Sequence, residues 1–326
     1  MNKRYLFLII VILFSGQAYS NESSDLDGRD LAKNLYSLIL ESDTQSILSA
    51  FSDTPNIDTP RTGAIKGKQD FIKFIASEKA WLLQYGFVEG SLHAVRTTES
   101  ADRIVYEQKL TLNNTGPMKH HKIAVVVDLD DGKASTVRVY YRLNPITGSH
   151  DFSRPALLEH KPELVSDLAP PIKQYVASIE NAYLDVYRMF TEGSCVNHLC
   201  GDNLPKFFVM AMHAGSVPLE LTTVMCDESA CAMEWNLASW GDTMFSIKIG
   251  GLSIFEFNNK GQVTEGRIYD DIHDAPFMRP GWFAEHQEAL TAKFEAVGCP
   301  LIIDAKLKDP MPKAFGKLLK QPCGEL

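Results

Sequence analysis

The sequence predicts an α+β protein with two tandem domains, in each of which N-terminal helices pack on a strongly curved antiparallel sheet. Three observations lead to this fold class. Strand-like segments recur as an internal repeat, segments with helical spacing precede each copy, and a turn glycine holds the same place in both copies. Helices followed by a run of strands, rather than strict alternation of the two, are typical of the α+β class.

Apolar residues at helical spacing predict helices ahead of each set of strands. In the first half they mark residues 30–48 and 68–80. In the second half they form one stripe along residues 171–190, directly after Pro170. Proline is tolerated in the first turn of a helix, so this position is a plausible helix start.

The internal repeat is the most informative feature of the sequence. Each copy has a glutamate with leucine three residues later, then an apolar run, then a tight turn with glycine, then Arg-(Val/Ile)-Tyr with the tyrosine eight residues after the glycine. The copies comprise residues 104–110, 123–127, Gly132 and Tyr140, and residues 231–237, 252–257, Gly261 and Tyr269. Each copy therefore predicts three antiparallel strands, the last two joined by a hairpin whose glycine adopts positive φ.

The first twenty residues have the features of an export signal. Two basic residues stand near the start, residues 6–14 are an unbroken apolar run, and small residues precede a cleavage point after Ser20. We expect residues 1–20 to be removed and the remaining chain to be periplasmic or secreted. An uncleaved membrane anchor is the alternative.

Charge and composition exclude several classes of protein. The 326 residues carry a formal net charge of −9 and no dense run of Lys or Arg, which argues against a nucleic-acid partner. With 45% hydrophobic and 22% charged residues, the composition is that of a soluble globular protein. No later apolar run is long enough for a helix across a bilayer, so we expect no stable membrane span after signal removal.

The six cysteines all follow residue 194. In an oxidising compartment an even number of cysteines favours disulfides, and we expect neither a metal ion nor another cofactor. A zinc site in which the segment 195–200 joins the second cysteine pair is the alternative. We favour the three pairs that are local in sequence: Cys195–Cys200, Cys226–Cys231 and Cys299–Cys323.

Several phrases carry a resemblance to a known fold family. They are the segment 63–72 in the first half, and Glu234-Trp235, the segment 253–257, Lys260-Gly261 and the segment 267–271 in the second half. With helices preceding a bent sheet, they resemble the nuclear-transport-factor-2-like (NTF2-like) cone, in particular the SnoaL-like group. The resemblance implies two tandem cone-shaped domains.

The implied organisation divides the whole chain into five parts. It comprises a signal peptide at 1–20, a first SnoaL-like domain at 30–148, a linker at 149–167, a second SnoaL-like domain at 168–275 and a C-terminal extension at 276–326.

The resemblance also implies a pocket between the concave face of each sheet and its helices. Enzymes of this group, such as ketosteroid isomerases, polyketide cyclases and epoxide hydrolases, use acidic pocket residues as general acids or bases, whereas other members only bind ligands or dimerise. Asp270 and Asp271 are the candidate catalytic residues, of which only one can face the pocket because neighbouring strand residues point to opposite faces. The alternative is a solvated strand end or an ion pair with Arg267.

Glu107, Tyr140, Glu234, Trp235 and Tyr269 are the candidate pocket-lining residues. The two glutamates hold matching strand positions and are either pocket carboxylates or outward-facing residues, of which we favour the second. Each tyrosine either donates a hydrogen bond to a ligand oxygen or packs half-buried, and the tryptophan is core or pocket wall.

Two functions follow from these observations. The first is an exported small-molecule-binding or interaction protein whose two domains pair as an intramolecular pseudo-dimer, with a hydrophobic small molecule as the possible ligand. The alternative is an isomerase-, cyclase- or hydratase-like enzyme that acts on a hydrophobic, oxygenated small molecule through Asp270 or Asp271. We favour the first, because no repeated pair of acid and base is evident.

Overall fold

The structure is a computed structural model that describes residues 26–148, 168, 170–181, 189–197, 199–200, 219–237, 249–270 and 288. The predicted signal peptide, the predicted linker, Asp271, the predicted Cys299–Cys323 pair and nearly all of the predicted C-terminal extension lie outside the described residues. The proposed domain boundaries therefore stay predictions. Within the described part, no helix is long and apolar enough to cross a membrane.

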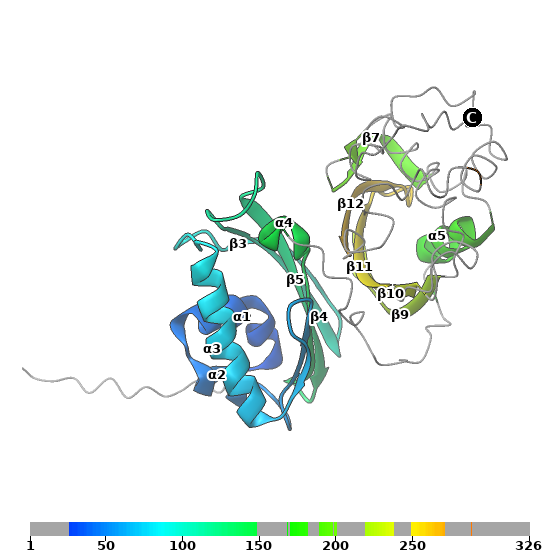
Figure 1. The fold of residues 1–326 in the computed structure, drawn as a ribbon. Coiled ribbons are helices and arrows are strands. Elements are labelled where there is room, and N and C mark those ends of the chain that lie inside the picture. The colour runs from blue at the N-terminus through cyan, green and yellow to red at the C-terminus, as the bar shows by residue number, and fades with distance from the viewer. Residues whose placement is uncertain are drawn as a thin grey trace, which may run out of the picture.

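The first half forms one six-stranded sheet with helices on one face (Figure 1). Its strand order is β2-β1-β6-β5-β4-β3, and only the β1–β6 pair is parallel. Its elements are α1 (Gly28–Glu41), α2 (Thr44–Ser49), β1 (Asn56–Thr59), β2 (Gly63–Lys66), α3 (Lys68–Gln84), β3 (His93–Glu99), β4 (Arg103–Thr111), β5 (His120–Asp130), β6 (Lys133–Tyr140) and α4 (Asn144–Thr147).

The second half repeats this topology. Its strand order is β8-β7-β12-β11-β10-β9, again with one parallel pair, β7–β12. Its described elements are α5 (Pro170–Asn181), β7 (Phe190–Val196), β8 (Leu199–Cys200), β9 (Leu219–Cys226), β10 (Ala230–Leu237), β11 (Ile249–Phe257) and β12 (Val263–Asp270). The α+β class is confirmed, and the repeat extends to all six strands, although each sheet is mixed rather than wholly antiparallel.

The strands that the repeat predicted are present, and so are the two hairpins. Residues 104–110 and 123–127 lie within β4 and β5, and Asp131 and Gly132 both adopt positive φ in the turn to β6. Two positive φ values in succession suit the right-handed twist of a tight hairpin.

Two helix predictions were wrong in extent. The segment 30–48 is broken because Ser42 takes a left-handed conformation with φ 63° and Asp43 caps a new helix by accepting from the backbone N–H of Ser46. In the segment 171–190, Phe190 belongs to β7, where it contacts Phe255 with ring centroids 6.0 Å apart. Tertiary packing on the sheet decides the conformation of Phe190.

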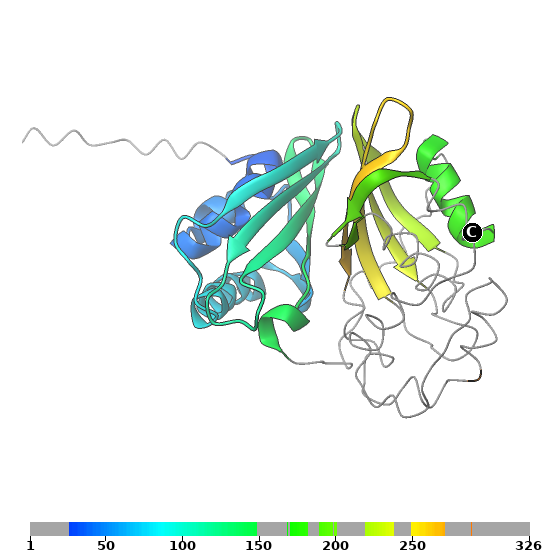
Figure 2. The ribbon, with the colours of Figure 1, turned by 90° about the horizontal axis from the view of Figure 1, so that it is seen from above.

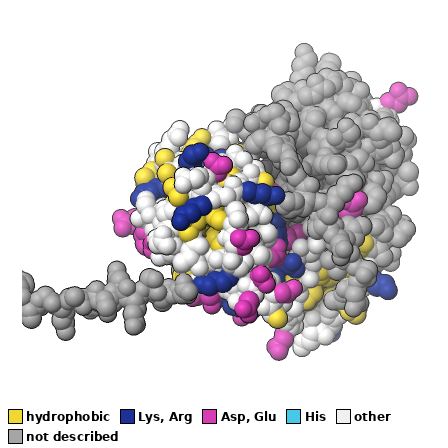
Figure 3. Space-filling view, turned by 90° about the horizontal axis from the view of Figure 1, so that it is seen from below, with side chains coloured by type: hydrophobic (Ala, Val, Ile, Leu, Met, Phe, Trp, Pro, Cys, Tyr) yellow, Lys and Arg dark blue, Asp and Glu magenta, His cyan; other side chains and the backbone are white. Residues whose placement is uncertain are grey.

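The sheets face each other, and their helices lie on the outer sides (Figure 2). In the first half, the buried faces of α1 and α3 pack on inward residues of β4, β5 and β6 such as Ile104, Val125 and Val139. In the second half, Tyr175 of α5 meets Phe255 edge-on at 5.0 Å. On the face seen in Figure 3, described side chains of both charges are interspersed.

Candidate functional site

Four of the five predicted pocket residues lie where the two sheets meet, on the faces turned away from the helices: Glu107, Tyr140, Glu234 and Tyr269. Along β4, Ile104 and Leu110 pack in the helix-side core, whereas Val105 belongs to a second buried cluster. Glu107 is two residues after Val105 and so shares its face. This second cluster, here called the inter-sheet cluster, draws on both sheets: Val105, Ala124, Val126, Tyr140, Met225, Ala232, Leu252, Ile254 and Tyr269.

Glu234 of the second sheet is bound by two side chains of the first. The guanidinium of Arg138 donates to both carboxylate oxygens, from Nε to Oε1 at 2.6 Å and from Nη2 to Oε2 at 2.9 Å. The hydroxyl of Tyr140 donates to Oε1 at 2.7 Å. Arg138 also binds Asp128 of its own sheet. A bidentate pair of this kind fixes geometry as well as charge.

Glu107 of the first sheet has the same surroundings with the halves exchanged. Arg267 donates from Nε to Oε1 at 2.6 Å and from Nη2 to Oε2 at 2.9 Å, and the Tyr269 hydroxyl donates to Oε1 at 2.7 Å. Arg267 also donates to Glu256 of its own sheet at 2.7 Å. Each arginine therefore joins a carboxylate of its own sheet to one of the other.

Burial and charge set the protonation states of Glu234, Tyr140 and Tyr269. Both glutamates are 1% exposed. Burial opposes ionisation of Glu234, yet the charge and hydrogen bonds of Arg138 lower its pKa on balance, so the carboxylate is ionised at neutral pH. Burial, followed by the adjacent carboxylate, raises the pKa of Tyr140 and Tyr269 well above its usual value. The arrangement can join two sheets, and its tyrosines stay protonated donors.

The candidate catalytic residues follow one another at the end of β12. The backbone of Asp270 pairs with that of Gly251 at the end of β12, but its side chain, like the whole of Asp271, lies outside the described residues. Arg267, the partner considered for these aspartates, pairs with glutamates.

Trp235 lies on the helix-side face of the second sheet. Its indole N–H donates to the Ser253 hydroxyl at 2.9 Å, and the side chain is 5% exposed. Gly251 leaves room for the ring, since a Cβ there would lie 2.3 Å from it. Trp235 is thus a buried side chain on the helix-side face, and its contact with a ligand stays a prediction.

A buried ion pair inside the first half was missed by sequence reasoning. Glu78 of α3 is fully buried and accepts from Arg61 Nε at 2.7 Å, while the Arg61 guanidinium lies 5.7 Å from the ring centroid of Trp81. Burial raises the pKa of Glu78, and the charge of Arg61 opposes that rise. Its Oε1 has no hydrogen-bond partner among the described residues.

A signal for this pair exists in the sequence. Glu78 falls at helical spacing with Phe71, Ile75 and Leu82, all buried, so a carboxylate interrupts the apolar stripe of α3. Buried charges are paired, and Arg61 supplies the pair from the connection between β1 and β2.

Two of the three predicted disulfides are confirmed. Cys195–Cys200 joins β7 to β8, and Cys226–Cys231 joins β9 to β10. The four sulfur atoms that the zinc alternative requires are therefore bonded in two pairs, so they are not thiolates that could bind zinc. Cys299–Cys323 lies outside the described residues.

Solved structures with similarity to this chain are short proteins that each match about a third of it. An NTF2-like protein of unknown function from Burkholderia pseudomallei is 20% identical, with 37% of this chain and 97% of that chain covered and a TM-score of 0.29. For an NTF2-like protein of unknown function from Cytophaga hutchinsonii, the values are 13%, 37%, 94% and 0.28. For a SnoaL-like protein of unknown function from Burkholderia thailandensis, they are 12%, 35%, 93% and 0.28.

No family model matches the chain, and no curated protein matches it. The similarity to these NTF2-like and SnoaL-like proteins carries no activity with it.

Proposed function

We propose that this chain is an exported binding or interaction protein in which two SnoaL-like domains pair as an intramolecular pseudo-dimer. The observation that carries the proposal is the exchange of contacts around Glu107 and Glu234. Each glutamate accepts from an arginine and a tyrosine of the opposite sheet. Contacts that occur twice with the roles exchanged are characteristic of an interface with two-fold symmetry.

The apolar part of the contact supports the same symmetry. In the inter-sheet cluster, Val105 and Ala232 each stand two residues before the buried glutamate of their strand. Tyr140 and Tyr269 also hold matching places in it. Besides the ion pairs, the apolar surface buried between the sheets stabilises their contact by about 25 cal/mol per Å².

Pairing through these faces leaves the helix-side faces for a ligand. In the second half that interior includes Trp235, Met233 and Phe255, with the Ser253 hydroxyl as a polar group. A site that opened among these residues would suit a hydrophobic small molecule with few polar atoms. Mass spectrometry of material that co-purifies with the exported protein would identify the class of ligand.

Export is supported by the two disulfides, because such bonds persist in oxidising compartments. The test is the N-terminal sequence and intact mass of the protein recovered from cell fractions. We expect a chain that begins at Asn21, found outside the cytoplasm. A full-length chain in the cytoplasm with free thiols would contradict export.

The pairing of the domains is tested by charge reversal. Glu107→Lys together with Glu234→Lys sets a lysine against each arginine, which should separate the sheets and raise the radius of gyration measured by X-ray scattering. The control is Glu41→Lys with Glu89→Lys, two exposed glutamates and the same change in net charge. Far-UV circular dichroism establishes that both proteins keep their sheets. Equal compactness of the two folded proteins would contradict the pseudo-dimer.

A further inference from the structure

The Cys226–Cys231 disulfide closes the hairpin that touches the other half of the molecule. The two cysteines lie directly opposite each other in the β9–β10 ladder, and the tight turn from Asp227 to Ala230 follows at once. Cys226 is exposed, whereas Cys231 is 4% exposed. Cys226 is therefore the solvent-exposed member of the pair, directly before the turn.

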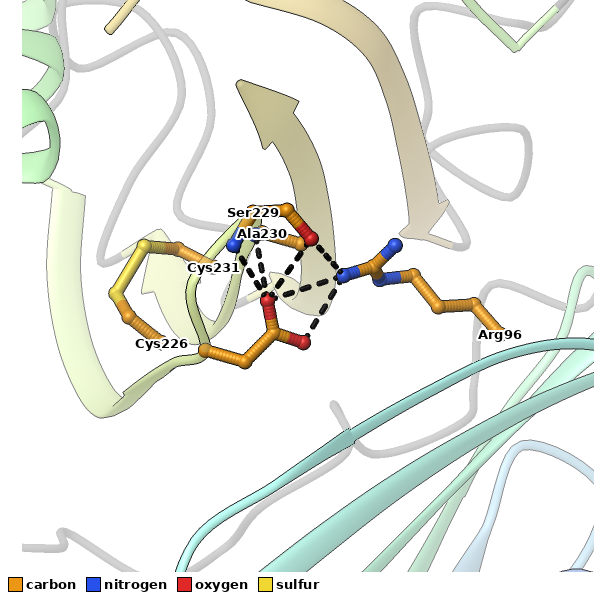
Figure 4. The surroundings of a disulfide bond; sticks show 6 residues. Arg96, Cys226, Ser229, Ala230 and Cys231 are labelled. Atoms are coloured by element: carbon orange, nitrogen blue, oxygen red, sulfur yellow. Dashed lines mark hydrogen bonds and ion pairs between the residues drawn. A yellow bond between two sulfur atoms is a disulfide. The ribbon is translucent and has the colours of Figure 1, made fainter. Parts of the chain in front are cut away.

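Asp227 binds the backbone of this turn and also the side chain of Arg96 of β3. Figure 4 shows Arg96 beside Ser229 and the disulfide. Oδ1 of Asp227 accepts from the backbone N–H groups of Ser229 and Ala230, both at 2.8 Å, and from the Ser229 hydroxyl. Nη2 of Arg96 donates to Oδ1 at 3.0 Å, to Oδ2 at 2.9 Å and to the Ser229 hydroxyl at 2.9 Å. Arg96 thus binds an acceptor group whose shape depends on the turn.

The equivalent hairpin of the first half is held differently. Glu99 and Ile104 are the counterparts of Cys226 and Cys231, because they hold the same places before Glu107 as the cysteines hold before Glu234. Glu99 and Ile104 also pair directly in the β3–β4 ladder. Arg29 of helix α1 binds this hairpin at the Glu99 carboxylate and at the carbonyls of residues 100 and 101. One hairpin is held by its own helix, and the other by a disulfide and an arginine from the opposite sheet.

We propose that Cys226–Cys231 is a redox-sensitive latch between the two halves. With the disulfide formed, the turn holds Asp227 in the geometry that binds Arg96. A dithiol reductant breaks the bond between the sulfurs by supplying two electrons and two protons, so that Cys226 and Cys231 become thiols and the dithiol becomes a cyclic disulfide. The end of the hairpin then frays, and Arg96 loses Asp227 and keeps only the Glu256 carboxylate of β11, 3.9 Å from its Nη1. This inference rests on the proposed pairing of the domains.

The test is hydrogen exchange of the Ser229 and Ala230 amides, followed by NMR in the mature full chain. With the disulfide intact, Arg96→Ala should accelerate their exchange about fivefold, the factor for a contact of about 1 kcal/mol. In Cys226→Ala/Cys231→Ala protein, or after treatment with dithiothreitol, both amides should exchange faster, and Arg96→Ala should add nothing. Cys195→Ala/Cys200→Ala is the control for loss of a disulfide, and the fivefold effect of Arg96→Ala should survive in it.

Two results would overturn the latch. The first is an undiminished effect of Arg96→Ala when Cys226 and Cys231 are replaced. The second is no effect of Arg96→Ala in the intact protein. X-ray scattering from the Glu107→Lys/Glu234→Lys protein then separates the two failures. If this variant expands, the proposed pairing of the domains stands and only the latch is refuted. If it stays as compact as its control, both proposals are refuted.

Discussion

Glu107 and Glu234 occupy the same place in two copies of one strand, and each is bound by the arginine and tyrosine of the opposite copy. Both carboxylates are buried, and each arginine reaches a second carboxylate in its own sheet. The contact between the sheets therefore depends on buried ion pairs, and removing one partner leaves the other buried without its counter-charge.

Replacing Glu234 by alanine should be strongly destabilising. Arg138 would keep its buried guanidinium without the main partner, and breaking such a pair costs about 3–5 kcal/mol. Urea unfolding followed by intrinsic fluorescence measures the change. Glu265→Ala is the control, because that carboxylate also pairs with an arginine but is 51% exposed, so it should cost less than about 1 kcal/mol. Similar losses in both variants would contradict the structural role of Glu234.

Tyr140→Phe and Tyr269→Phe should cost similar free energies of unfolding. Each change removes one hydrogen bond of 2.7 Å to a buried carboxylate and leaves the ring in place. A hydrogen bond to a charged group contributes about 1.5–3 kcal/mol. Denaturation of the two variants under the same conditions checks the equality. A loss confined to one of them would show that the two contacts are not equivalent.

Gly251→Ala should disturb the interior of the second half. The added Cβ would meet the Trp235 ring at 2.3 Å, and overpacking of this kind costs about 1–3 kcal/mol. Trp235 fluorescence and the unfolding midpoint report the effect. Gly116→Ala is the matched control, because a Cβ there meets nothing within 4 Å. Equal behaviour of the two variants would argue against the packing around Trp235.

Stability should fall in acid through the Glu234 carboxylate. Although burial raises it, the pKa of Glu234 is lowered by Arg138 below the usual 4.5. A carboxyl whose pKa is lower in the folded state stabilises the fold above its unfolded value, and this stabilisation disappears as pH falls through the folded value. Glu234→Gln should therefore flatten the decline of unfolding free energy below about pH 4.5. An unchanged acid profile would contradict the shift.

Glu78, which pairs with Arg61 in the first half, has a raised pKa, in contrast to the lowered pKa of Glu234. Burial already raises the pKa of Glu78, and Arg61 opposes this rise. Arg61→Met removes the opposing charge, so the pKa of Glu78 should rise further, whereas Arg61→Lys should retain much of the wild-type value. Carboxyl NMR chemical shifts followed with pH measure it. An unchanged pKa in Arg61→Met would show that the two side chains do not interact in solution.

Much of the fold follows from local sequence patterns. Helical spacing located α1 and α3, and the recurrence of Glu, turn glycine and Arg-(Val/Ile)-Tyr located three strands in each half. The β1 and β2 strands were not predicted, because each has four residues and too little alternation to set it apart from a loop. The short spacing of the cysteines was enough to predict Cys195–Cys200 and Cys226–Cys231.

The sequence by itself determined the repeat, the positions of Glu107, Tyr140, Glu234 and Tyr269 within it, and the two disulfides. Only the tertiary structure decided that each glutamate meets the arginine of the other half, since residues separated by 96 and 160 positions in the chain have no local pattern that pairs them. It also decided the pairing of Arg61 with Glu78 and of Arg96 with Asp227. The physical reason is that alternation along a strand selects a face, whereas the partner of that face depends on packing between whole sheets.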